Sequence, residues 1–142
     1  MATTVKWYGD EVRKNIEADV DAKLRIGCEW VLDEARRLMA EPKHGTPPPS
    51  GRKNENWVVA RSKGGEAPAA QTSRLQGALT VGHGNNILKR IKRGWWRVGT
   101  NVEYHLPLER PTGKGQVKVA RPLMEPALAR AWPKIKALFR AS

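Results

Sequence analysis

One long run of helical periodicity constrains this chain more than any other feature of its sequence. Between Asp10 and Met39, apolar residues recur every three or four positions, which places them along one side of an α-helix. The members of this stripe are Val12, Ile16, Val20, Leu24, Gly27 or Cys28, Val31, Ala35 and Leu38. The pattern predicts one helix over 10–40 with Asp10 as its N-cap, and Pro42 prevents the helix from continuing.

The length of this helix has a consequence for assembly. At about 1.5 Å per residue it would span roughly 45 Å, which is longer than the core of a domain of this size. We therefore expect part of the apolar stripe to contact another chain. The alternative is a break near Gly27, which would give two shorter helices on one core.

Composition limits the class of protein. A chain of 142 residues has the length of one domain, so we expect 1–142 to form a single domain. One cysteine allows neither an internal disulfide nor a cysteine-based zinc site. No apolar run is long enough for a signal peptide or a membrane span, so we expect synthesis in the cytoplasm and no membrane association.

The net charge of +12 is unevenly distributed. Residues 1–50 contain 8 Lys/Arg and 9 Asp/Glu, whereas residues 51–142 contain 18 basic and 5 acidic residues. All the excess positive charge therefore lies in the second part of the chain. Such a field favours an acidic partner, either a nucleic-acid backbone or an acidic protein surface.

Downstream of the first helix, the sequence predicts a small sheet between long loops. A proline-rich loop is expected over 42–56, and 57–101 should contain the sheet together with a short helix near 73–80. Residues 57–61 have the composition of a strand. The clearest hairpin is two strand-like runs, 87–92 and 95–98, around a glycine turn.

Two further helices complete the expected fold. One is short and covers 102–110, and the other covers 122–140, with Pro122 in its first turn and a bend at Pro133. The second has an apolar stripe of Met124, Leu128, Ala131 or Trp132, Ile135, Leu138 and Phe139. The predicted class is α+β, with a long N-terminal helix and a C-terminal helix packed on a small, mostly antiparallel sheet with long loops.

The predicted hairpin combines positive charge with flat rings. Five basic residues surround Trp95 and Trp96, namely Lys89, Arg90, Lys92, Arg93 and Arg97. This combination is typical of platforms for single-stranded nucleic acid, on which charge follows phosphates and rings stack on bases. The alternative is that one tryptophan packs in the core, the other packs against a neighbour, and the basic residues form a solvated face. We therefore treat these five residues as candidates that face either DNA or an acidic partner.

The sequence gives little support for catalysis. The three histidines, His44, His83 and His105, contain no pair at metal-ligand spacing, and Cys28 lies beside the apolar stripe, where an inert thiol is expected. Glu103 and Glu109 are six positions apart, a spacing that does not place them together on one helical face. We expect no catalytic, cofactor or metal site, and no enzymatic activity.

Several short motifs occur in order along the chain. They are Pro68, Thr72-Ser73-Arg74-Leu75, Val98-Gly99-Thr100-Asn101-Val102-Glu103-Tyr104, Leu108-Glu109, Thr112-Gly113, Ala120-Arg121-Pro122-Leu123 and Pro126-Ala127-Leu128. This order resembles the minor tail-component family of long-tailed phages, the neck or tail-completion proteins. The resemblance extends from about Val12 to Leu138. The signature residues that we carry over as structural are Gly99, Asn101, Tyr104, Glu109, Arg121 and Pro122.

The resemblance implies a structural virion protein at the neck or the top of the tail. There, a homo-oligomeric ring, a hexamer or a dodecamer, would help to join the DNA-filled head to the tail. Its neighbours would be head-completion or connector proteins and tail-terminator or tail-tube proteins, with possible non-specific contact to packaged double-stranded DNA. We also expect an ion pair between Glu109 and Arg121. The alternatives are a tail-terminator ring, a stand-alone basic nucleic-acid-binding module and, with least support, a toxin or nuclease.

Overall fold

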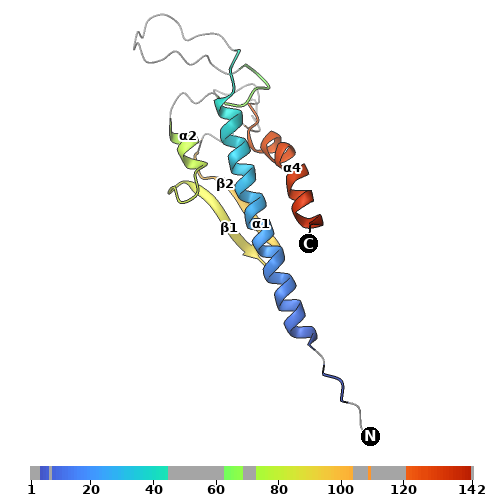
Figure 1. The fold of residues 1–142 in the computed structure, drawn as a ribbon. Helices are drawn as coiled ribbons and strands as arrows, with labels where there is room; N and C mark the ends of the chain where they lie inside the picture. Colours follow the sequence, from blue (N-terminus) through green and yellow to red (C-terminus); the bar gives the residue numbers. More distant parts are fainter. Residues whose placement is uncertain are drawn as a thin grey trace, which may run out of the picture.

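The computed structural model describes residues 4–6, 8–44, 63–68, 73–103, 109 and 121–141. Its elements in chain order are α1 (Gly9–Ala40), α2 (Ser73–Ala78), β1 (Asn86–Lys92), β2 (Trp95–Thr100) and α4 (Met124–Arg140). Two long helices and an antiparallel hairpin confirm the α+β class. In Figure 1, α1 runs through the middle of the molecule, and its N-terminal half projects beyond the other elements.

Helix α1 is continuous over 32 residues, so the break considered near Gly27 does not occur. The predicted N-cap is wrong, because the cap position is Tyr8 and Asp10 lies in the first helical turn beside Glu11. Tyr8 provides no side-chain cap. The two carboxylates therefore support the helix start through the positive end of its dipole.

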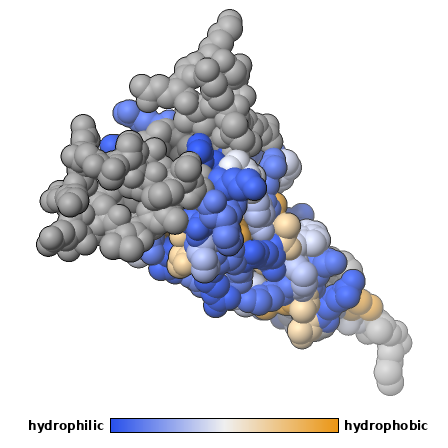
Figure 2. Space-filling model, turned by 90° about the horizontal axis from the view of Figure 1, so that it is seen from above, coloured by the Kyte–Doolittle hydropathy of each residue, from blue (hydrophilic) through white to orange (hydrophobic). Residues whose placement is uncertain are grey.

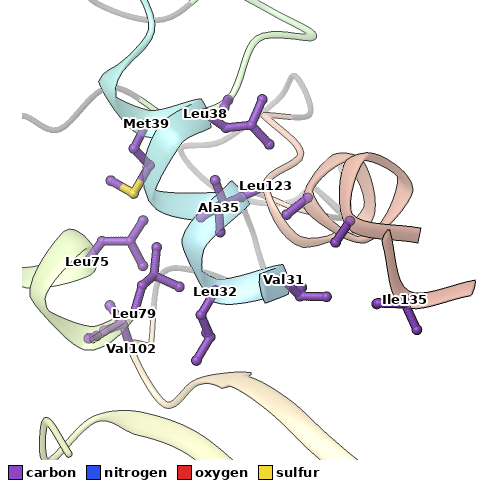
Figure 3. Close-up of a cluster of buried hydrophobic side chains, with 14 residues drawn as sticks. Val31, Leu32, Ala35, Leu38, Met39, Leu75, Leu79, Val102, Leu123 and Ile135 are labelled. Carbon is purple, nitrogen blue, oxygen red and sulfur yellow. The ribbon is translucent and has the colours of Figure 1, made fainter. Parts of the chain in front are cut away.

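The buried core lies on the C-terminal half of α1. Ala35 occupies its centre, and Figure 3 shows Leu75, Leu79 and Val102 on one side of α1 and Leu123 and Ile135 on the other. The buried hydrophobic residues are Val31, Leu32, Ala35, Leu38, Met39, Ala67, Leu75, Ala78, Leu79, Val102, Leu123, Ala127, Ala131 and Ile135. No member of this cluster precedes Val31, so the first half of α1 lies outside the core.

Helix α4 differs from the prediction in its start and in its buried face. It begins at Met124, so Pro122 precedes the helix and is not in its first turn. Its buried residues are Ala127, Ala131 and Ile135, which recur every four positions. Of the expected stripe, Ile135 and Ala131, the alternative to Trp132, are buried, whereas Leu128 and Trp132 are 48% and 51% exposed.

The packing of α4 also corrects the expected layering. Helix α4 packs on α1 and not on the hairpin, which itself packs on α1. Two alanines on the buried face of α4 allow a close approach, and a Cβ at Gly27 would lie 3.2 Å from Cγ1 of Ile135. Small side chains at this contact therefore allow α4 to pack closely on α1.

Several expected elements fall outside the described residues. They are the strand 57–61, the part of the proline-rich loop beyond His44, and residues 104–108 and 110 of the short helix expected over 102–110. Glu109 is helical, but Val102 and Glu103 are not, so the predicted start of that helix at 102 is wrong. Within the described part, the sheet consists of β1 and β2 alone. None of the described helices combines the length and the apolarity that crossing a membrane requires.

Candidate functional site

The basic hairpin has two different faces. Arg90 pairs with Trp96 across the strands, and Lys89 pairs with Arg97. Because cross-strand partners point to the same side and successive residues alternate, these two pairs lie on opposite faces. The first pair faces α1 through contacts with Asp21, and we call this side the inner face.

A bulge between Arg90 and Lys92 changes the alternation in β1. Lys92 pairs with Trp95, and its ammonium lies 4.9 Å from the centre of that ring. A regular strand would place Lys92 on the same side as Arg90, but the extra residue moves it to the opposite face. The outward face is thus formed by Lys89, Lys92, Trp95 and Arg97.

Asp21 of α1 holds the inner face of the hairpin. Its Oδ1 accepts hydrogen bonds from the N–H of Gly94 at 3.1 Å and from Nε1 of Trp96 at 3.4 Å. Its Oδ2 lies 2.6 Å from Nη2 of Arg90. Partial burial acts to raise the pKa of Asp21, but these partners outweigh it and hold the pKa below its ordinary value. The carboxylate therefore stays charged and holds the hairpin on α1.

Glu17 makes a second contact one helical turn before Asp21. Its Oε1 lies 2.9 Å from Nη1 of Arg93 in the hairpin turn. Residues four positions apart share one side of a helix, so both carboxylates point to the hairpin. Neither contact was predicted from the sequence. The spacing of the two carboxylates opposite a strongly basic hairpin was the signal that could have revealed both.

These contacts divide the five candidate cations into two groups. Arg90 and Arg93 are neutralised by α1. Lys89, Lys92 and Arg97 are exposed on the outward face and have no ion-pair partner within the described ranges. Trp95 lies among them with 63% of its surface exposed, whereas Trp96 is half-buried against Asp21.

A cleft lies where α1, the turn before β1 and the hairpin meet. It is formed by Arg25 of α1, by His83 in the turn before β1, and by strand residues that include Leu88 and Arg90. Nη2 of Arg90 is held by Asp21, and Nε of Arg25 lies 3.3 Å from Oε1 of Glu29. These two cations are therefore already partnered, whereas Lys89, which also lines the cleft, has no ion-pair partner within the described ranges.

Glu109 binds the backbone at the start of α4. Its carboxylate accepts hydrogen bonds from the backbone N–H groups of Leu123, Met124 and Glu125, at 2.7, 2.9 and 3.0 Å. These amides begin α4 and have no partner inside the helix. Glu109 therefore caps α4 from a segment more than a dozen residues upstream. The expected ion pair with Arg121 stays a prediction.

The other signature residues have local roles. Gly99 in β2 has φ +155°, a value that residues with a Cβ rarely adopt. The N–H of Asn101 donates to the carbonyl of Asn85 at 2.9 Å, which ties the end of β2 to the start of β1. Pro122 is half-buried before α4, and Tyr104 lies outside the described residues.

Reactive side chains do not converge in the described part of the chain. Nδ1 of His44 lies 2.5 Å from Oε1 of Glu66, and Nδ1 of His83 accepts from the N–H of Asn85 at 3.2 Å. His105 lies outside the described residues. The structure, as far as it is described, contains no group of three His, Cys, Asp or Glu residues able to hold a metal.

Cys28 is half-buried on α1. Burial, and secondarily the charge of Glu29, raises the pKa of its thiol. The thiol therefore stays protonated near neutral pH, and this state is a poor nucleophile.

The N-terminal half of α1 presents an uncovered apolar ridge. Val12 and Ile16 are 52% and 58% exposed, and Tyr8 precedes them by one turn. With Lys6, Gly9, Arg13 and Glu17, these three residues line a shallow groove. Figure 2 shows hydrophobic residues among hydrophilic ones at the narrow end of the molecule. We call Tyr8, Val12 and Ile16 the α1 ridge.

Comparison of the chain with protein-family models, with curated proteins and with solved structures found no match in any of the three searches.

Proposed function

We propose that this protein is a non-enzymatic structural subunit of a tailed-phage particle. In this role, copies of the chain form a ring at the neck or the top of the tail and help to join the DNA-filled head to the tail. Two independent lines of support lead to this proposal. One is the ordered series of motifs that resembles the tail-completion family, and the other is the α1 ridge.

The α1 ridge is the observation that carries the proposal. The first half of α1 lies outside the core, and Glu17 and Asp21 connect it to the hairpin. A helical segment with few tertiary contacts is only marginally stable in water. Covering the exposed part of Val12 or Ile16 would contribute about 1 kcal/mol each. A neighbouring subunit that packs on the ridge would provide this stabilisation.

A ring requires that each subunit use two different surfaces. In a head-to-tail interface, one surface of a subunit contacts a different surface of the next subunit, and closure of the series gives a ring. The α1 ridge is well placed for the first of these surfaces because it projects beyond the rest of the described fold (Figure 1). The held hairpin and the capped α4 provide a rigid body from which it projects.

The direct test is removal of this protein from the phage that produces it, followed by electron microscopy of the lysate. The proposal predicts full heads and finished tails that are not joined. Overlong polymerised tails would instead identify a tail terminator, and normal infectious particles would refute a structural role of either kind.

A matched pair of substitutions tests the surface itself. Val12→Ser removes an apolar group from the α1 ridge, and Val81→Ser makes the same change at a position with 48% exposure in the turn before β1. We expect Val12→Ser to reduce the yield of joined particles and Val81→Ser to leave it unchanged. Equal yields for the two variants would show that the ridge is not an assembly surface.

A further inference from the structure

The outward face of the hairpin carries charge that the described fold does not neutralise. Lys89 and Arg97 are direct cross-strand partners, so two positive side chains lie beside each other on one face. Like charges in this position destabilise a strand pair. Lys92 adds a third cation through the bulge. An anion bound across this face would remove the repulsion.

The charges on the inner face show that this arrangement is selective. Arg90 and Arg93 each lie within 3 Å of a carboxylate of α1, at 2.6 and 2.9 Å. The hairpin itself contains no acidic residue, and on its outward face the described part of the chain places no carboxylate at ion-pair distance from Lys89, Lys92 or Arg97. The hairpin thus uses two of its cations for folding and leaves three for a partner.

We propose that Lys89, Lys92 and Arg97 bind the phosphate backbone of double-stranded DNA without reading its sequence. Charge complementarity is the first reason, because this face carries only positive charges and lies in the part of the chain, 51–142, that has 18 basic and 5 acidic residues. Shape is the second, since a two-stranded ribbon fits the major groove, which is about 12 Å wide. The third reason is the type of cation. Two of the three residues are lysines, and lysine is depleted in protein–protein interfaces but common in phosphate contacts.

The exposed tryptophan fits this assignment as a positioning group. Lys92 lies over the ring of Trp95 at 4.9 Å, which holds its ammonium on the outward face beside the other two cations. This binding to DNA is a property of the purified protein, separate from head–tail joining. It does not depend on whether the chain forms part of a neck.

The salt dependence of binding gives the expected size of the effect. Each phosphate neutralised on duplex DNA contributes about −0.9 to the slope of log K against log salt, so three contacts contribute about −2.7. Loss of these contacts should flatten the slope by about that amount. The affinity for duplex DNA at about 50 mM salt should fall by about tenfold or more.

The test is fluorescence anisotropy with a labelled DNA duplex over a series of salt concentrations. The outward-face variant is Lys89→Gln/Lys92→Gln/Arg97→Gln. The matched control is Lys14→Gln/Lys136→Gln/Arg140→Gln, which makes the same change of formal charge at exposed positions elsewhere. We expect the slope to flatten only in the outward-face variant. An equal loss in both would show that net charge alone drives binding and would overturn the proposal.

Two adjacent residues provide a finer comparison that does not need a triple variant to fold. Lys92→Gln removes an outward cation, whereas Arg93→Gln removes one that Glu17 already neutralises. Weaker DNA binding by the Lys92 variant alone supports the assignment. Equal binding by both variants contradicts it.

Two other ligands separate the possible partners. Poly-glutamate carries negative charge without phosphate, and tighter binding to it than to the duplex would identify an acidic protein surface as the partner. Single-stranded DNA of the same length tests base stacking. Preferential binding to the single strand that Trp95→Ala abolishes would refute the assignment to duplex DNA.

Discussion

Removal of the Glu109 carboxylate should loosen α4 more than any other single change of charge near it. Three backbone N–H groups at the start of this helix donate to the carboxylate, at 2.7, 2.9 and 3.0 Å. A hydrogen bond to a charged group contributes roughly 1.5–3 kcal/mol, and loss of a helix cap typically costs about 0.5–2 kcal/mol. The three bonds share one carboxylate, and water can replace part of them, so their contributions do not add. We expect Glu109→Ala to lower the free energy of unfolding by about 2–4 kcal/mol.

Urea and thermal unfolding followed by circular dichroism measure this loss. For a domain of this size, it corresponds to a fall in Tm of roughly 5–15 °C. Glu109→Gln keeps one acceptor oxygen and should lose about half as much free energy. Glu103→Ala is the control, because it removes the same charge from an exposed side chain six positions upstream.

Hydrogen exchange locates the effect. In the Glu109→Ala variant, the amides of Leu123, Met124 and Glu125 should exchange faster, because they lose their acceptor. The reasoning is refuted if Glu109→Ala and Glu103→Ala differ by less than about 0.5 kcal/mol, the usual range for surface substitutions.

Two further predictions follow from the described contacts. Gly27→Leu should lower the free energy of unfolding by about 1–3 kcal/mol through overpacking, because a Cβ at this position would already lie 3.2 Å from Ile135. Urea unfolding measures this loss. A variant as stable as the wild type would contradict the close contact between α1 and α4. The hydrogen bonds from the N–H groups of Lys63 and His44, with the His44 ring, lower the pKa of Glu66 from 4.5 to about 2. Because the folded-state pKa is depressed, Glu66 should stabilise the fold fully above about pH 4.5 and lose this effect as the pH falls towards 2. The difference in unfolding free energy between wild type and Glu66→Gln should therefore shrink over that interval, and a constant difference would show that the contact is absent in solution.

The periodicity of apolar residues predicted α1 and the hairpin well, because it shows which side of a helix or strand is apolar. The apolar stripe located α1, and the two strand-like runs around Gly94 located the hairpin. Periodicity does not show which element, or which other chain, will cover the apolar face of a helix. The stripe of α4 predicted burial for Leu128, but the helix turns its small residues Ala127 and Ala131 towards α1 instead.

Contacts that depend on the backbone were beyond sequence reasoning. The ion pair of Glu109 with Arg121 stays a prediction. The capping of α4 by Glu109 was not predicted, because it depends on backbone amides, which every residue except proline carries. The bulge after Arg90 depends on local strand geometry, and it decides which side of the hairpin Lys92 occupies. The contact between Asp21 and Arg90 could have been predicted from the sequence, because two acidic residues four positions apart on a helix face a basic hairpin.

The central claim is that the α1 ridge is covered by another copy of the chain. Sedimentation velocity of the purified protein over a range of concentrations tests this claim most directly, with Val12→Ser/Ile16→Ser as the variant. We predict that the wild-type chain forms a discrete oligomer, whereas the variant stays a folded monomer, because neither residue belongs to the core. A wild-type chain that remains monomeric at every concentration, with the amides of 9–20 protected from exchange, would contradict the claim.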